Sequence, residues 1–231
     1  NAHFVAGAET ARKQTGLRTE LGLPDRYFMC CARFVEKKNL SMLVRAYARY
    51  RKRVGTAAWK LVLVGDGPLR EPLEQKVRTL GLGSDVFFPG FQTYEDLPAY
   101  YGLADAFVLP SRYEQWGLVV NEAMAAGLPV LVSEHCGCAP DLVAEGKNGW
   151  TFSPDDPGAL AQLMARISND NLDRGGMGRV SRNRIQGWSP DTFAQSMVAA
   201  AETAQAQEVA PLNLLDRFLL RALVYKVLLS G

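Results

Sequence analysis

Two acidic residues at a fixed spacing are the first candidates for chemistry in this sequence. Seven residues separate Glu114 from Glu122, and Gly117 and Leu118 between them open an apolar run of helical length. The first N–H groups of a helix lack helical partners, and with the helix dipole they attract anions. Ionised carboxylates accept hydrogen bonds from hydroxyl groups. The two glutamates therefore suit a ligand that carries sugar hydroxyls on both sides of a phosphate, such as a sugar nucleotide.

The segment that carries these residues predicts a strand, a loop, a helix and a second strand. The apolar runs 105–110 and 128–133 have strand length, and the helix is predicted from 117 to 127. A crossover of this kind joins parallel strands. Ligands of open parallel sheets bind outside the carboxyl ends of the strands, and the loop with Glu114 lies at such an end. The tilt of helical side chains directs Glu122 toward the same place.

Two cations follow the first apolar strand, which is predicted at 27–32. Arg33 comes directly after that strand, and Lys38 precedes a predicted helix over 39–53. Arginine offers a planar fork of donors to a phosphate, and lysine adds a compact charge. The alternative is an exposed basic turn without a ligand.

The spacing of Glu114 and Glu122, with Gly117 and Leu118 inside it, resembles the signature of retaining GT-B glycosyltransferases, the group 1 enzymes of glycosyltransferase family 4. The resemblance extends from about residue 18 to about residue 204. It implies transfer of a hexosyl group from a UDP-, GDP- or ADP-hexose donor, with retention at the anomeric carbon. It also implies an acceptor sugar or lipid-linked glycan, and no obligatory metal or other cofactor.

The resemblance also implies roles for individual residues. Arg33 and Lys38 match the cations that grip the donor diphosphate, with help from the helix start at Gly117 and Leu118. Glu114 matches the residue that holds hydroxyls of the donor sugar. Glu122 matches the residue that holds the ribose hydroxyls.

A turn at Phe91 and Gln92 follows a short strand predicted at 85–88. In the resembled family this turn contacts the nucleobase, partly through backbone groups, and Phe91 offers a face for stacking. The alternative is that Phe91 belongs to the hydrophobic core with Phe87 and Phe88.

Composition and pattern predict a single α/β domain in most of the chain. The chain has 231 residues, 48% of them hydrophobic, which is enough for a sizeable core. We expect a Rossmann-like, doubly wound, mainly parallel sheet with helices on both faces, the C-terminal half of a GT-B fold. Residues 1–22 match an interdomain linker and 23–207 the donor-binding domain. The apolar segment 208–231 is expected as a helix that packs on protein or lies at a membrane surface.

The resemblance predicts that an N-terminal acceptor domain belongs to the same protein. If that domain is required for turnover, this chain is a nucleotide-sugar-binding module without transfer activity. This second function stays open at the level of the sequence.

Several other functions are disfavoured. The net charge of +2 gives no electrostatic case for nucleic acid. The turn at 65–68 reads GDGP and lacks the third glycine of a dinucleotide fingerprint, which argues against an NAD-dependent oxidoreductase. His135, Cys136 and Cys138 lack a second ligand pair at zinc-binding spacing. The four cysteines do not have disulfide-like spacing and predict a cytoplasmic protein, with contact at the inner membrane face as the alternative for the tail.

Overall fold

The computed structural model describes residues 1–206 and divides the chain into two units. The first unit is Asn1–Ser189, and the second begins at Pro190 with helix α10 (Pro190–Ala206). The apolar helix predicted over 208–231 lies outside the described residues. Within residues 1–206, no helix has both the length and the apolar character needed to cross a membrane.

A sheet of six parallel strands forms the centre of the first unit, in the order β3-β2-β1-β4-β5-β6. The strands are β1 (Tyr27–Cys31), β2 (Lys60–Val64), β3 (Val86–Gly90), β4 (Ala106–Leu109), β5 (Val130–Ser133) and β6 (Gly149–Phe152). Each corresponds to an apolar run in the sequence, because strands covered on both faces carry few polar residues. The prediction of a parallel Rossmann-like sheet is confirmed.

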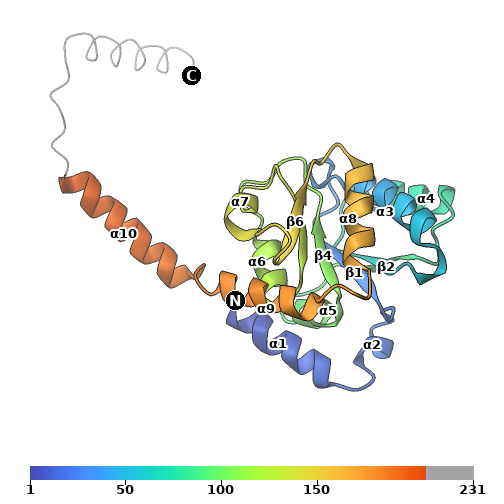
Figure 1. The fold of residues 1–231 in the computed structure, drawn as a ribbon, viewed down its shortest axis with the longest axis horizontal. Coiled ribbons are helices and arrows are strands. Elements are labelled where there is room, and N and C mark those ends of the chain that lie inside the picture. Colours follow the sequence, from blue (N-terminus) through green and yellow to red (C-terminus); the bar gives the residue numbers. More distant parts are fainter. Residues whose placement is uncertain (207–231) are drawn as a thin grey trace, which may run out of the picture. The chain divides into compact units, whose positions relative to one another are not determined.

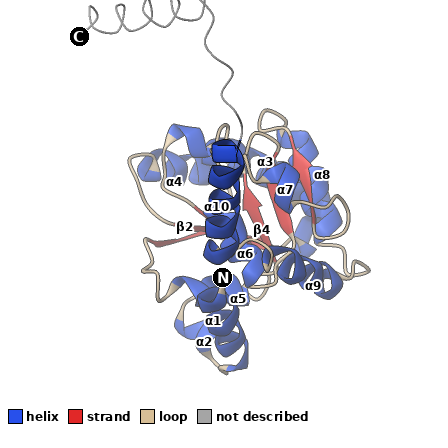
Figure 2. Cartoon of the chain, turned by 90° about the vertical axis from the view of Figure 1, so that its left-hand side faces the viewer, coloured by secondary structure: helices blue, strands red, loops and turns tan. Residues whose placement is uncertain are grey.

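Helices cover both faces of this sheet (Figures 1 and 2). One face packs against α3 (Leu40–Val54), α4 (Arg70–Thr79) and α8 (Pro157–Ile167). The other packs against α1 (Ala2–Lys13), α5 (Leu97–Leu103), α6 (Leu118–Ala125) and α9 (Arg174–Ile185). Shorter helices complete the unit: α2 (Leu17–Glu20), α7 (Ala139–Leu142), and the 3-10 turns η1 (Glu36–Lys38) and η2 (Gly55–Ala57).

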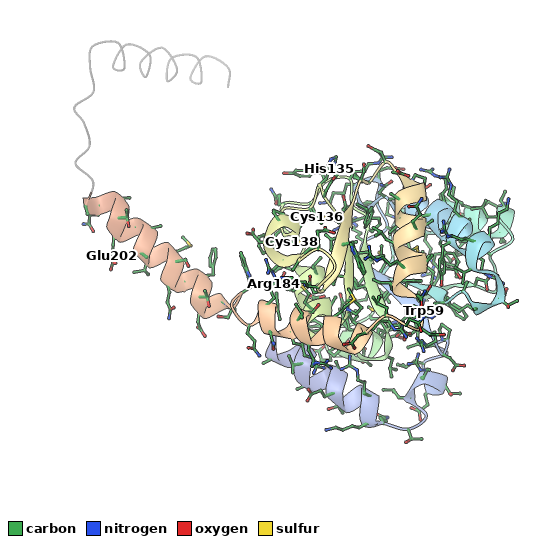
Figure 3. All side chains as sticks on the ribbon, viewed as in Figure 1. Trp59, His135, Cys136, Cys138, Arg184 and Glu202 are labelled. Carbon is green, nitrogen blue, oxygen red and sulfur yellow. The ribbon has the colours of Figure 1, made fainter. Side chains whose placement is uncertain are left out.

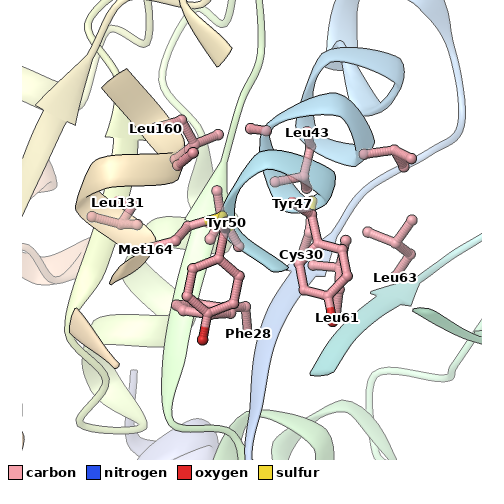
Figure 4. Close-up of a cluster of buried hydrophobic side chains, with 14 of the residues drawn as sticks. Phe28, Cys30, Leu43, Tyr47, Tyr50, Leu61, Leu63, Leu131, Leu160 and Met164 are labelled. Atoms are coloured by element: carbon pink, nitrogen blue, oxygen red, sulfur yellow. The ribbon is translucent and has the colours of Figure 1, made fainter. Parts of the chain in front are cut away.

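Strand residues alternate between the two cores. Phe28 and Cys30 of β1 lie in the core under α3, whereas Tyr27 and Met29 lie in the opposite core. Figure 4 shows the first core, where Tyr47 and Tyr50 of α3 lie among side chains from the sheet and from α8. The Tyr47 hydroxyl donates to backbone carbonyls, so its burial leaves no unpaired polar atom.

The first 22 residues form helices for which the sequence analysis had no pattern. Phe4, Ala8 and Ala11 of α1 recur at helical spacing and are buried against α5. The two helices approach closely, since a Cβ at Gly102 would lie 2.8 Å from the backbone of Ala8. Residues 1–22 therefore belong to the first unit, and their role as an interdomain linker stays a prediction.

The order of the strands places the loops that matter for function. The chain winds outward from β1 to β3 and then returns to place β4 on the other side of β1. The loops after β1 and β4 therefore diverge at this topological switch point, where open α/β sheets bind ligands. The loop after β2 crosses the loop after β1, and the Phe34 N–H donates to the Asp66 carbonyl (2.8 Å).

Replacement of Gly65 by Ala tests this crossing. Gly65 has a φ of +123°, and a Cβ there would lie 2.0 Å from the Ala32 carbonyl oxygen. We expect Gly65→Ala to lower the free energy of unfolding by about 1–3 kcal/mol in urea denaturation. Gly83→Ala is the matched control, because a Cβ at Gly83 meets nothing within 4 Å. Equal stability of the two variants would show that the loops do not depend on this glycine.

Candidate functional site

An ion pair joins the two loops at the switch point. The Lys38 ammonium, at the end of η1, donates to Oε2 of Glu114 in the loop after β4, and both side chains are only 14% exposed. Lys37 lies at the edge of the pair, with Nζ 3.9 Å from Oε1 of Glu114. The backbone N–H of Arg112 donates to the Lys37 carbonyl at 2.8 Å. The fold thus brings together two of the residues that the sequence analysis selected.

The turn at Asn39 orients the loop that carries Lys38. Asn39 is the sole non-glycine residue with a positive φ (56°) within 1–206, a conformation that asparagine tolerates better than most residues. Its buried side chain donates to the Pro154 carbonyl at 2.8 Å. This bond fixes the point at which η1 ends and α3 begins.

The turn at 135–138 supports the Glu114 loop from the other side; Figure 3 labels His135, Cys136 and Cys138 of this turn. The Gly137 N–H donates to the Glu114 carbonyl at 2.9 Å, and a ring nitrogen of His135 pairs with the Arg112 carbonyl at 3.1 Å. A Cβ at Gly137 would lie 1.9 Å from the Gln115 carbonyl oxygen. The turn therefore requires glycine at its centre in order to hold the loop.

The cysteines of this turn have a structural environment. Cys136 and Cys138 are buried, and burial raises the pKa of each thiol to about 12. Such thiols stay protonated near neutral pH, whereas nucleophilic and metal-ligating cysteines are thiolates. Residues 1–206 contain no group of three or more His, Cys, Asp or Glu side chains placed to hold a metal ion.

Glu122 lies inside α6, apart from the Lys38–Glu114 pair. Its Oε2 accepts a hydrogen bond of 2.8 Å from the hydroxyl of Tyr101 in α5. Burial raises the pKa of Glu122, while the Tyr101 bond and His3 act in the opposite direction. Within the described residues, no hydrogen bond or ion pair joins Glu122 to Lys38 or Glu114. The sequence analysis did not find Tyr101, because nothing in the local pattern links residues 21 positions apart.

The helix between the glutamates begins without a side-chain cap. Gly117 is the N-cap of α6 with a φ of 110°, and as a glycine it provides no side-chain cap. The Val120 N–H donates to the Gly117 carbonyl at 2.8 Å, so the N–H groups of Leu118 and Val119 are the ones at this helix start that a ligand could use. Leu118 is 68% exposed beside them.

The remaining predicted site residues lie at the same edge of the sheet, where Arg33 and Phe91 are exposed and Gln92 is half-buried. Arg33 is exposed, and its guanidinium has no hydrogen bond or ion pair within residues 1–206. Phe91 is 77% exposed, so its assignment to the core is wrong. The Gln92 side chain donates to the Pro89 carbonyl at 3.0 Å. The binding roles of these residues stay predictions.

Fold and site together define an α/β protein of the Rossmann class. Its carboxyl edge presents cations, open helix N–H groups and two carboxylates around the topological switch point. These are groups that bind phosphates and sugar hydroxyls.

The chain belongs to the family of glycosyl transferases group 1, whose model matches residues 13–184. It is 32% identical over 205 residues to the GDP-mannose-dependent alpha-(1-6)-phosphatidylinositol monomannoside mannosyltransferase of Mycolicibacterium smegmatis. That match covers 83% of this chain and 52% of the relative, so the chain spans about half the length of that protein. The predicted membership of a glycosyltransferase family is confirmed.

Two solved structures show the same architecture. Anabaena HepE, solved in complex with UDP, has a TM-score of 0.71 at 25% identity, over 82% of this chain and 52% of HepE. The C-terminal domain of the group 1 glycosyl transferase LpcC from Francisella tularensis has a TM-score of 0.65 at 23% identity. This second match covers 73% of the chain and 88% of the LpcC domain.

Thiol reactivity tests the structural role of the 135–138 turn. We expect Cys30, Cys136 and Cys138 to react slowly with a thiol reagent at pH 8 in the native protein, because they are buried and protonated. All three should react rapidly after unfolding in urea. Rapid modification of Cys136 or Cys138 in the folded protein would instead indicate an ionised, accessible thiolate.

Proposed function

We propose that this chain is the donor-binding part of a retaining hexosyltransferase, the C-terminal half of a longer GT-B enzyme. The observation that carries the proposal is the Lys38–Glu114 pair at the switch point, with Arg33 exposed beside the end of β1 and without an ion pair within residues 1–206. The match to the LpcC C-terminal domain and the half-length coverage of the mycobacterial relative support the assignment to one half of the enzyme.

The cations of the site would bind the donor diphosphate. Arg33 has no partner to give up among residues 1–206, and a nearby phosphate would gain charge-assisted hydrogen bonds from its guanidinium. Lys38 is held in place by Glu114 and adds a second positive charge. With the open N–H groups of α6, these cations would stabilise the negative charge that develops on the leaving diphosphate.

The carboxylates would bind the two sugars of the donor. Glu114 lies beside the cations, so it would hold hydroxyls of the transferred hexose. Glu122 lies inside α6 and would hold the ribose hydroxyls. Phe91 exposes a ring on which the base would stack, next to Gln92. Neither glutamate is assigned as a general base.

Retention at the anomeric carbon completes the proposed reaction. The bond from the anomeric carbon to the diphosphate oxygen breaks, and the acceptor oxygen forms its bond on the same face of the sugar. The acceptor's hydroxyl proton passes to the leaving phosphate. No protein base or metal ion is needed for this balance.

A binding module without turnover is the second candidate. The chain spans about half of the relative that it matches, and an acceptor site on the other half would be required for transfer. This candidate predicts donor binding by the chain without release of product. A transfer assay on the chain, and then on the longer protein, separates the two functions.

Calorimetric titration with UDP, GDP and ADP, each with and without a hexose, tests donor binding. We expect saturable binding of one nucleotide, and GDP is the first to test because the mycobacterial relative is GDP-mannose-dependent. Arg33→Ala and Lys38→Ala should each weaken it roughly tenfold or more, because each loses a charge-assisted contact. Arg45→Ala is the control, because Arg45 is exposed and has no ion pair within residues 1–206. No binding to the folded chain would refute the donor-binding function.

A further inference from the structure

The Tyr101 hydroxyl lies in the interior of the first unit, on helix α5. Its side chain is fully buried, and the hydroxyl points at the half-buried carboxylate of Glu122. The Cys31 thiol at the end of β1 faces the same hydroxyl. A tyrosine has one proton to donate, and a carboxylate is a far stronger acceptor than a thiol. The proton therefore lies on the bond to Glu122.

Tyr101 is held by packing that does not involve Glu122. The Phe4 ring of α1 meets the Tyr101 ring edge-on with centroids 5.5 Å apart, and Phe107 of β4 lies at 5.7 Å. The next residue, Gly102, is in close contact with the backbone of Ala8. The hydroxyl is therefore a fixed donor, and the Glu122 side chain, which has more rotatable bonds, takes its position from it.

The charged and titratable groups that face Glu122 come from three elements. Tyr101 lies on α5, Cys31 ends β1, and His3 lies at the start of α1. Burial raises the pKa of Glu122, and the hydrogen bond from Tyr101 lowers it. Oε1 of Glu122 has no hydrogen bond within residues 1–206, so one oxygen is engaged and the other is available.

We propose that Tyr101 is a positioning residue, which binds one carboxylate oxygen of Glu122 and thereby presents the other to the vicinal hydroxyls of the bound nucleotide. This inference rests on the proposed function, in which Glu122 holds the ribose. It assigns part of the preference for ribose over deoxyribose to a side chain that does not touch the ligand. Removal of the Tyr101 hydroxyl would free the carboxylate to rotate and to take up a proton.

The carboxyl group of Glu122 provides the first test and needs no nucleotide. Its titration can be followed by the ¹³C carboxyl resonance, assigned with Glu122→Gln. We expect Tyr101→Phe to raise the pKa of Glu122, because the carboxylate loses its donor while burial remains. Tyr100→Phe is the matched control, since this buried tyrosine on the same helix has no hydrogen bond to its hydroxyl within residues 1–206. An unchanged pKa in Tyr101→Phe would overturn the inference.

The second test compares a ribonucleotide with its 2′,3′-dideoxy analogue, using whichever of UDP, GDP or ADP the unaltered chain binds. Tyr101→Phe should weaken the ribonucleotide roughly tenfold at neutral pH and leave the analogue unchanged. Because binding needs the ionised carboxylate, the affinity for the ribonucleotide should fall as the pH drops through the pKa of Glu122. In Tyr101→Phe this fall should begin at a higher pH, because the pKa of Glu122 is higher there. Equal weakening of both nucleotides would indicate a merely structural role and overturn the inference. Absence of nucleotide binding by the unaltered chain would instead refute the proposed function.

Discussion

The candidate site depends on one electrostatic constraint: a lysine ammonium that is only 14% exposed must be paired. A poorly hydrated charge is costly, and loss of its partner leaves that cost uncompensated. Lys38 meets the requirement with Glu114, across the divergence between β1 and β4. Since each residue comes from a different loop, the pair also fixes the two loops relative to each other. The positive charge is thus held at the carboxyl edge of the sheet before any ligand arrives.

Glycines at close backbone contacts make this arrangement sterically feasible. Gly65 lies against the Ala32 carbonyl and Gly67 against the backbone of Phe34, so the loop after β2 can cross the loop after β1. Gly137 lies against the Gln115 carbonyl, beneath the loop that carries Glu114. The GDGP turn, which resembles part of a dinucleotide fingerprint, has a packing role here. Its glycines contact protein backbone.

The second carboxylate depends on a different part of the chain. Glu122 is bound by Tyr101, and Tyr101 is packed by Phe4 of α1. The N-terminal helix thus contributes indirectly to the half of the site that we assign to the nucleoside. The two carboxylates have separate supports, so substitutions at Lys38 and at Tyr101 should affect different parts of a bound donor.

The sequence by itself determined the strands, most helices and the positions of the site residues along the chain. The apolar run 27–32 predicts a strand, and the pattern around Glu114 predicts a strand, a helix and a second strand. Both predictions are possible because periodicity and turn residues are local properties of the sequence. The tertiary structure alone decided that Lys38 pairs with Glu114, that Tyr101 binds Glu122 and that the Phe91 ring is exposed. These outcomes depend on how distant elements pack, and residues up to 76 positions apart leave no periodic signal of their contact.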